Sequence, residues 1–118
     1  GCTMFIMSVN IDCYLEDPRL FKTHQGAIDA MFEVLDGYAY SCCGYSSDNV
    51  RNEVRAIKKS IDSGADAVDK IVDGWIEVYV TQYGASICFP DVNPYANYVD
   101  YGKCEVNITN MDEIEVEE

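Results

Sequence analysis

The chain has 118 residues, and its 21 Asp and Glu side chains against 8 Lys and Arg give a formal net charge of −13. This surplus of carboxylates disfavours direct binding to nucleic acid, because such binding draws its affinity from cations that replace counterions. The apolar fraction of 48% indicates one globular domain, and no apolar run reaches the roughly 20 residues that cross a bilayer.

The first expected element is a strand over residues 4–11, "MFIMSVNI", whose alternate apolar residues share one face. Residues 1–3, before the first methionine, are interpreted as a cloning remnant or as the end of a trimmed precursor. Pro18 then ends the extended segment. A helix follows, capped by Asp17 or, with a restart at Gly26, by Thr23.

Three helices are expected in succession. The first has apolar residues at helical spacing from Ala27 to Leu35 and ends at Gly37. The second begins at Ser46 or Ser47 and ends at Gly64, with its apolar stripe at Val50, Val54, Ile57 and Ile61. The third is short, ends at Gly74, and has Ala67, Val68, Ile71 and Val72 on one side.

The apolar period then changes to that of a strand. A strand over residues 75–82 turns at Tyr83 and Gly84 into a partner over 85–89. A loop rich in Pro, Asn and Tyr precedes a last strand over residues 103–109. The acidic segment 111–118 forms an edge strand or stays loose. The order β-ααα-ββ-β predicts a single α+β domain, residues 1–118, with a helical layer on a largely antiparallel sheet of four to five strands.

Acidic and phenolic side chains predict where a partner binds. Nine tyrosines are present, and tyrosine provides large contact area at low entropic cost. Those in the last long loop stand beside acids, a combination that stacks on Arg and pairs with Lys. The expected partner-binding residues are Tyr95, Tyr98, Asp100, Tyr101, Asp112, Glu113, Glu115, Glu117 and Glu118.

The six cysteines do not form a recognisable reactive or metal-binding pattern. No C-x-x-C pair occurs, and adjacent cysteines such as Cys42 and Cys43 rarely bridge each other. We expect packing thiols, with one of this pair buried and the other exposed. His24 is the only imidazole, and a dyad with Cys13 is the arrangement that would support catalysis. No enzyme activity, metal or cofactor is expected.

These features favour a small acidic inhibitor that occupies a basic, nucleic-acid-binding surface of another protein, such as a nuclease. Viral and bacterial proteins of this size and sign include anti-CRISPR and anti-restriction nucleic-acid mimics and toxin-immunity proteins, an analogy of composition alone. A cytoplasmic protein without membrane contact is expected. The even cysteine count and the "NIT" sequon at Asn107 also fit a secreted, disulfide-containing binding domain. A small Cys-dependent enzyme and a subunit of a larger assembly are compatible with the sequence as well.

Overall fold

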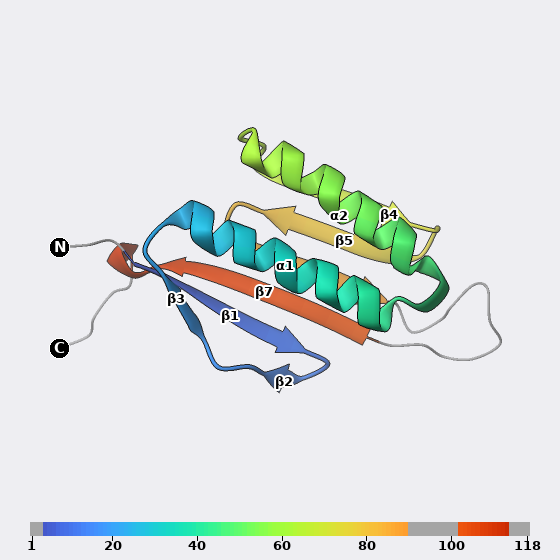
Figure 1. Cartoon of the computed structure of the whole chain (residues 1–118), viewed down its shortest axis with the longest axis horizontal. Helices are drawn as coiled ribbons and strands as arrows, with labels where there is room; N and C mark the ends of the chain where they lie inside the picture. The colour runs from blue at the N-terminus through green and yellow to red at the C-terminus, as the bar shows by residue number, and fades with distance from the viewer. Residues whose placement is uncertain (1–3, 90–101, 114–118) are drawn as a thin grey trace.

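The first and last strands of the chain lie side by side in one antiparallel sheet (Figure 1). The computed structural model describes residues 4–89 and 102–113. Strand β1 (Phe5–Ile11) pairs with β7 (Gly102–Asn110) along its whole length. Strands β6 (Gly84–Phe89), β5 (Ile76–Thr81) and β4 (Ala67–Val72) continue the sheet outward from β7 as a meander. The order is therefore β2-β1-β7-β6-β5-β4.

Two short strands flank the outer side of β1. They are β2 (Tyr14–Leu15) and β3 (Arg19–Phe21), both antiparallel to β1. The β1–β2 turn is made by Asp12 and Cys13, which have φ values of 51° and 73°, a left-handed conformation that suits two-residue hairpins. The sequence did not predict these strands, because two or three residues are too few to show alternation.

Helices α1 (His24–Cys42) and α2 (Ser47–Asp62) cover one side of this sheet (Figure 1). Thr23, not Asp17, caps α1: its Oγ1 accepts a 3.0 Å hydrogen bond from the N–H of Gly26. The expected end at Gly37 was wrong. The helix continues because Tyr38 and Ala39 extend its buried stripe, and this burial outweighs the roughly 1 kcal/mol that an interior Gly costs. A short 3-10 helix, η1 (Gly44–Ser46), joins α1 to α2.

The hydrophobic core lies between the helices and the sheet. The predicted stripe of α2 is buried at all four positions, Val50, Val54, Ile57 and Ile61. It packs with the α1 stripe against alternate residues of the inner sheet face, which include Met7, Val9, Ile76, Val78, Val80, Ile87, Cys104, Val106 and Ile108. Alternation along each strand therefore decides which residues enter the core.

The third predicted helix does not exist: residues 67–72 form strand β4. Its apolar residues also fit a strand, because Val68, Ile71 and Val72 are β-branched. β4 pairs with β5 from Ala67↔Thr81 to Val72↔Ile76. The positive φ of Asp73 (52°) and of Gly74 (81°) makes the turn between them.

The α+β class and the helical layer on an antiparallel sheet are confirmed. The element order is corrected to three strands, two helices and four strands within residues 4–89 and 102–113. The sheet has seven strands there, more than the four to five predicted. Of the segment 111–118, expected as an edge strand or a loose tail, residues 111–113 form a short 3-10 helix, η2 (Met111–Glu113), and residues 114–118 lie outside the described residues.

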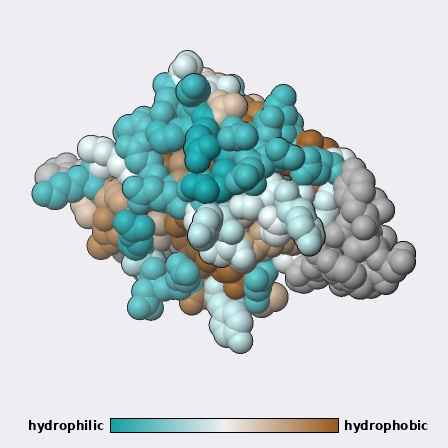
Figure 2. Space-filling model, turned by 45° about the vertical axis from the view of Figure 1, so that its right-hand side comes forward, coloured by the Kyte–Doolittle hydropathy of each residue, from teal (hydrophilic) through white to brown (hydrophobic). Residues whose placement is uncertain are grey.

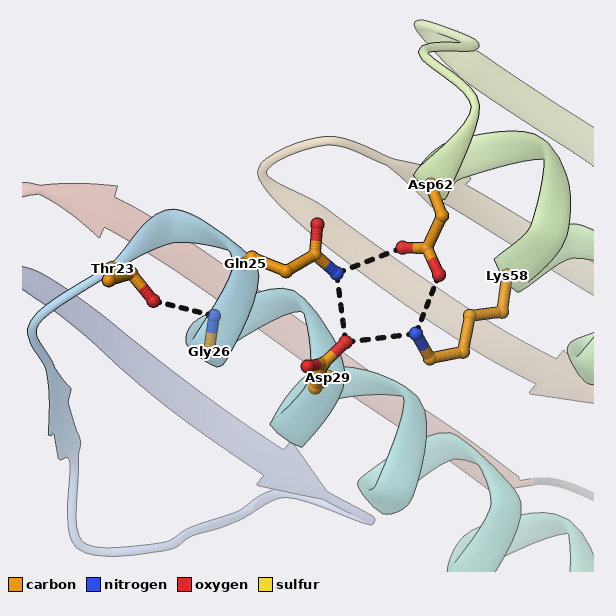
Figure 3. Close-up of polar contacts among 6 residues, drawn as sticks. All are labelled: Thr23, Gln25, Gly26, Asp29, Lys58 and Asp62. Atoms are coloured by element: carbon orange, nitrogen blue, oxygen red, sulfur yellow. Dashed lines mark hydrogen bonds and ion pairs between the residues drawn. The ribbon is translucent and has the colours of Figure 1, made fainter.

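A polar network joins the outer surfaces of the two helices (Figure 3). The Lys58 ammonium donates to Asp29 Oδ1 at 2.9 Å and to Asp62 Oδ2 at 2.7 Å. Gln25 Nε2 donates to the same two carboxylates. The hydrogen bonds from Lys58 lower the pKa of Asp29 and the pKa of Asp62. Figure 2 shows hydrophilic side chains gathered over the upper part of the molecule, the part in which Figure 1 shows α2.

Replacing Lys58 by Met should weaken the fold slightly and in a pH-dependent way. The network is largely solvent-exposed and screened, so we expect a loss of about 0.5 kcal/mol in the free energy of unfolding at neutral pH. The folded pKa values of Asp29 and Asp62 are lowered, so this stabilisation is present above their unfolded pKa of about 4 and is lost as the pH falls through the folded values. Urea denaturation of K58M and of the matched variant K59M measures it. A K59M loss as large as that of K58M, or a K58M loss that persists near pH 2, would contradict the assignment.

Candidate partner-binding face

Most of the residues predicted to bind a partner lie outside the described part of the chain. Residues 90–101 contain four of them, Tyr95, Tyr98, Asp100 and Tyr101, and residues 114–118 contain Glu115, Glu117 and Glu118. Asp112 and Glu113 belong to the 3-10 helix η2 (Met111–Glu113) after β7. Asp112 is exposed, and its backbone N–H donates to Asn110 Oδ1 at 3.0 Å. The predicted set therefore stays a prediction.

A different set of residues with the same chemistry lies on the sheet face that points away from the helices. We call this surface the open face. Its residues alternate with the core residues, and the strand registers place them on one side. On β4 to β6 they are Ala67, Asp69, Ile71, Glu77, Tyr79, Thr81, Gly84, Ser86 and Cys88. On β7 and β1 they are Lys103, Glu105, Asn107, Thr109, Ile6, Ser8 and Asn10.

One row of this face crosses five strands. Asp69 is opposite Tyr79, Tyr79 is opposite Ser86, Ser86 is opposite Glu105, and Glu105 is opposite Asn10. Neighbouring strands are about 4.8 Å apart, so the backbones of Tyr79 and Glu105 are roughly 10 Å apart. A phenol ring and a carboxylate therefore stand on either side of the small Ser86.

The small residues of β6 form the floor of a trough. A hollow of about 260 Å³ lies over Gly84 and Ser86, between Tyr79 and Tyr83 on one side and Glu105 and Asn107 on the other. A Cβ added at Gly84 would stand 2.9 Å from the backbone oxygen of Val106, so glycine allows these two strands to approach closely.

The trough continues toward the β1–β2 turn. A second hollow, of about 220 Å³, is lined by Asn10, Cys13, Lys103 and Glu105, and the last two residues also line the first hollow. The Lys103 ammonium pairs with Glu105 Oε2 at 3.1 Å. One ion pair therefore stands where the two hollows meet.

Tyrosine side chains are mostly at the surface in residues 4–89 and 102–113. Five of the six described there are exposed, namely Tyr14, Tyr40, Tyr45, Tyr79 and Tyr83, while Tyr38 is buried at 4% exposure. Tyr79 and Tyr83 are 44% and 46% exposed. They are therefore accessible from the trough, and their placement confirms that many phenol rings are not core residues.

Cations are concentrated on the other side of the molecule. Arg51 forms a bidentate pair with Asp36 at 3.0 and 3.2 Å, and Lys58 pairs with Asp29 and Asp62. On the open face, by contrast, Asp69 and Glu77 are exposed and form no ion pair with another described residue. The anionic surplus is therefore less compensated on the open face.

A larger hollow of about 520 Å³ lies between the helices. It is lined by Asp29, Phe32, Glu33, Asp36, Val54, Arg55 and Lys58. Two cations, Arg55 and Lys58, line it beside its three carboxylates, and Asp29 and Asp36 already pair with Lys58 and Arg51, whereas the trough is lined by one cation, Lys103. This interhelical hollow is therefore less suited to a cationic partner than the open face.

His24 has a structural position. Its ring stacks between Phe5, at a centroid distance of 5.2 Å, and Tyr83, at 4.5 Å. Its Nε2 is 2.6 Å from the carbonyl oxygen of Gln82. Phe5 begins β1 whereas Cys13 follows the end of that strand, so His24 and Cys13 are about 20 Å apart and do not form a dyad.

The vicinal cysteines behave as expected from the sequence: Cys43 is buried and Cys42 is exposed. Burial raises the pKa of the Cys43 thiol to about 12 and that of Cys104 to about 12. Cys13, Cys42, Cys43, Cys88 and Cys104 are all free thiols. Since the thiolate is the reactive form, Cys43 and Cys104 should be inert at neutral pH.

Alkylation of the native protein should follow this pattern. At neutral pH we expect iodoacetamide to modify the exposed Cys13 and Cys42, and to spare Cys43 and Cys104 until urea unfolds the chain. Tandem mass spectrometry of the digest distinguishes Cys42 from Cys43. Labelling of Cys104 at the native rate of Cys13 would contradict the described burial.

Metal and membrane sites are also constrained by the structure. Residues 4–89 and 102–113 contain no group of three or more His, Cys, Asp or Glu placed to hold a metal ion. None of the described helices is long and apolar enough to cross a membrane. Comparison with known proteins does not add a function: no family model, no curated protein and no solved structure matches this chain.

Proposed function

We propose that the protein is a small acidic inhibitor that occupies a basic, nucleic-acid-binding surface of a partner protein. The observation that carries the proposal is the open face, where the exposed Tyr79 lies opposite Asp69, two residues from Glu77 and two strands from Glu105. The exposed Tyr83 lines the same hollow as Tyr79 and Glu105. Arginine and lysine are the side chains that interact favourably with both groups.

The electrostatic field supports the same class of partner. With a net charge of −13, the chain is attracted to a cationic surface and repelled by nucleic acid. The ion pairs of the helical layer neutralise part of the negative charge on the helical side of the molecule, so the field is more negative on the open face. We therefore propose that the open face turns toward the partner during the encounter.

Inhibition would be steric and electrostatic. Carboxylates would take the place of phosphate groups on a Lys/Arg surface, and the tyrosines would provide desolvated contact area. The acidic residues predicted after β7, Asp112, Glu113, Glu115, Glu117 and Glu118, would supply further carboxylates to the same partner. Exposed Leu20 and Ile71, at 60% and 56% exposure, lie on this face as well and would add apolar contact.

Capture from lysate with two charge-matched triple variants tests this proposal. The open-face variant replaces three acids by amides, D69N, E77Q and E105Q, and the helix variant does the same with D48N, E33Q and E53Q. The wild type and the helix variant should both recover basic nucleic-acid-binding proteins at low salt. They should recover less of these proteins at moderate salt, because screening slows association. We expect the open-face variant to recover at least about tenfold less, because each lost charged hydrogen bond costs about 1.5–3 kcal/mol.

The captured protein then allows a direct test of inhibition. Added wild-type chain should displace nucleic acid from it in a mobility-shift assay, and a chain that ends at residue 113 should do so less well if the predicted acidic tail contributes. Recovery of acidic or neutral proteins alone would contradict the proposal. So would equal losses in the open-face and helix variants.

A further inference from the structure

The trough on the open face has the dimensions and side chains of a seat for one long cationic side chain. Its floor is the small Ser86 and Gly84, and its two walls bear Tyr79 and Glu105. The span of roughly 10 Å between those walls, two strand spacings, accommodates an extended arginine side chain. The methylene stem would lie on the ring while the guanidinium reaches the carboxylate.

The chain already places a cation of its own on this carboxylate. Lys103 is on β7 two residues before Glu105, on the same side of the strand, and its ammonium is 3.1 Å from Glu105 Oε2. Both side chains are 44% exposed, so the pair is weak and open to exchange. Lys103 thus shows where a cation sits in the trough and competes with any cation that arrives from outside.

The shape of the trough favours an extended segment over an isolated side chain. The two hollows meet at Lys103 and Glu105 and run from Tyr83 to Cys13 across β6, β7 and β1. An extended peptide repeats its side chains every two residues, at about 6.8 Å. One arginine side chain would therefore lie in the first hollow, between Tyr79 and Glu105, while the neighbouring residues of the peptide lie along the second hollow.

We propose that the trough binds an arginine-bearing extended segment of the basic partner, with the methylene stem of the arginine against Tyr79 and its guanidinium on Glu105, and that Lys103 limits the affinity by occupying Glu105. This inference rests on the proposed function and specifies its partner and its site. Arginine is favoured over lysine because a planar guanidinium donates two parallel hydrogen bonds to a carboxylate, whereas an ammonium acts as a point charge.

Substitutions of Glu105 and Lys103 should change the affinity for an arginine peptide in opposite directions. The probe is a fluorescein-labelled peptide of alternating Arg and Ser, measured by fluorescence anisotropy at low salt. E105Q should weaken binding about tenfold, since it removes a hydrogen bond between charged groups. K103M should strengthen binding about threefold, since the competing ion pair is lost. The same peptide with Lys in place of Arg should bind more weakly than the Arg peptide.

Matched variants separate the trough from general electrostatics. E53Q removes the same charge from α2, on the helical side of the sheet and outside both hollows, and K70M removes a cation from the edge strand β4. Both should change the affinity less than twofold. S86F fills the trough without a change of charge and should weaken binding about tenfold, whereas S8F, on the same face beyond the trough, should not. In the double variant K103M/E105Q the gain from K103M should disappear.

Two further outcomes distinguish this inference from the proposed function. If the open-face triple variant loses the captured partner while E105Q and S86F bind it like wild type, the face binds but the trough is not the seat, and the inference is overturned. If the triple variant also keeps the partner, both proposals fail. Equal gains for K103M and K70M would likewise overturn the role of Lys103. Circular dichroism of each variant confirms that the fold is retained.

Discussion

The sheet buries only one of its two faces against the helices, and this one-sided burial organises the described structure. The pairing of β1 with β7 gives the sheet a continuous apolar face, and the stripes of α1 and α2 cover it. Each strand residue that faces the core leaves its neighbours facing water on the other side. The hydrophobic effect therefore determines the position of the open face as firmly as it determines the core.

The distribution of charge follows from this arrangement. Amphipathic helices carry their polar residues outward, where Arg51 and Lys58 pair with carboxylates of the neighbouring helix. The strands supply tyrosines and acids at alternate positions, with few cations among them. A molecule with a net charge of −13 thus presents one partly neutralised side and one anionic, aromatic side. This asymmetry is what the proposed inhibition of a basic partner uses.

Much of the fold could be predicted from apolar periodicity. For the site, the sequence predicted the types of side chain, acids and tyrosines, but not which residues the fold brings together. The spacing of Val50, Val54, Ile57 and Ile61 located α2 correctly, and the alternation in β5 placed Glu77 and Tyr79 on one face. Residues 67–72 were misassigned because a partly exposed edge strand lacks alternation, and its partner β5 is what decides its conformation. The meeting of Tyr79 with Glu105 could not be predicted either, because it depends on the long-range register of β5, β6 and β7.

We propose that cations bind on the open face of the sheet and not where the helices meet. An NMR titration of isotope-labelled protein with an arginine-rich peptide tests it most directly, because every backbone amide reports separately. We expect the largest amide shifts along Tyr79, Ser86 and Glu105, with the amide shifts beside Asp29 and Lys58 unchanged. Shifts concentrated in the interhelical hollow, or spread evenly over all acidic residues, would contradict it.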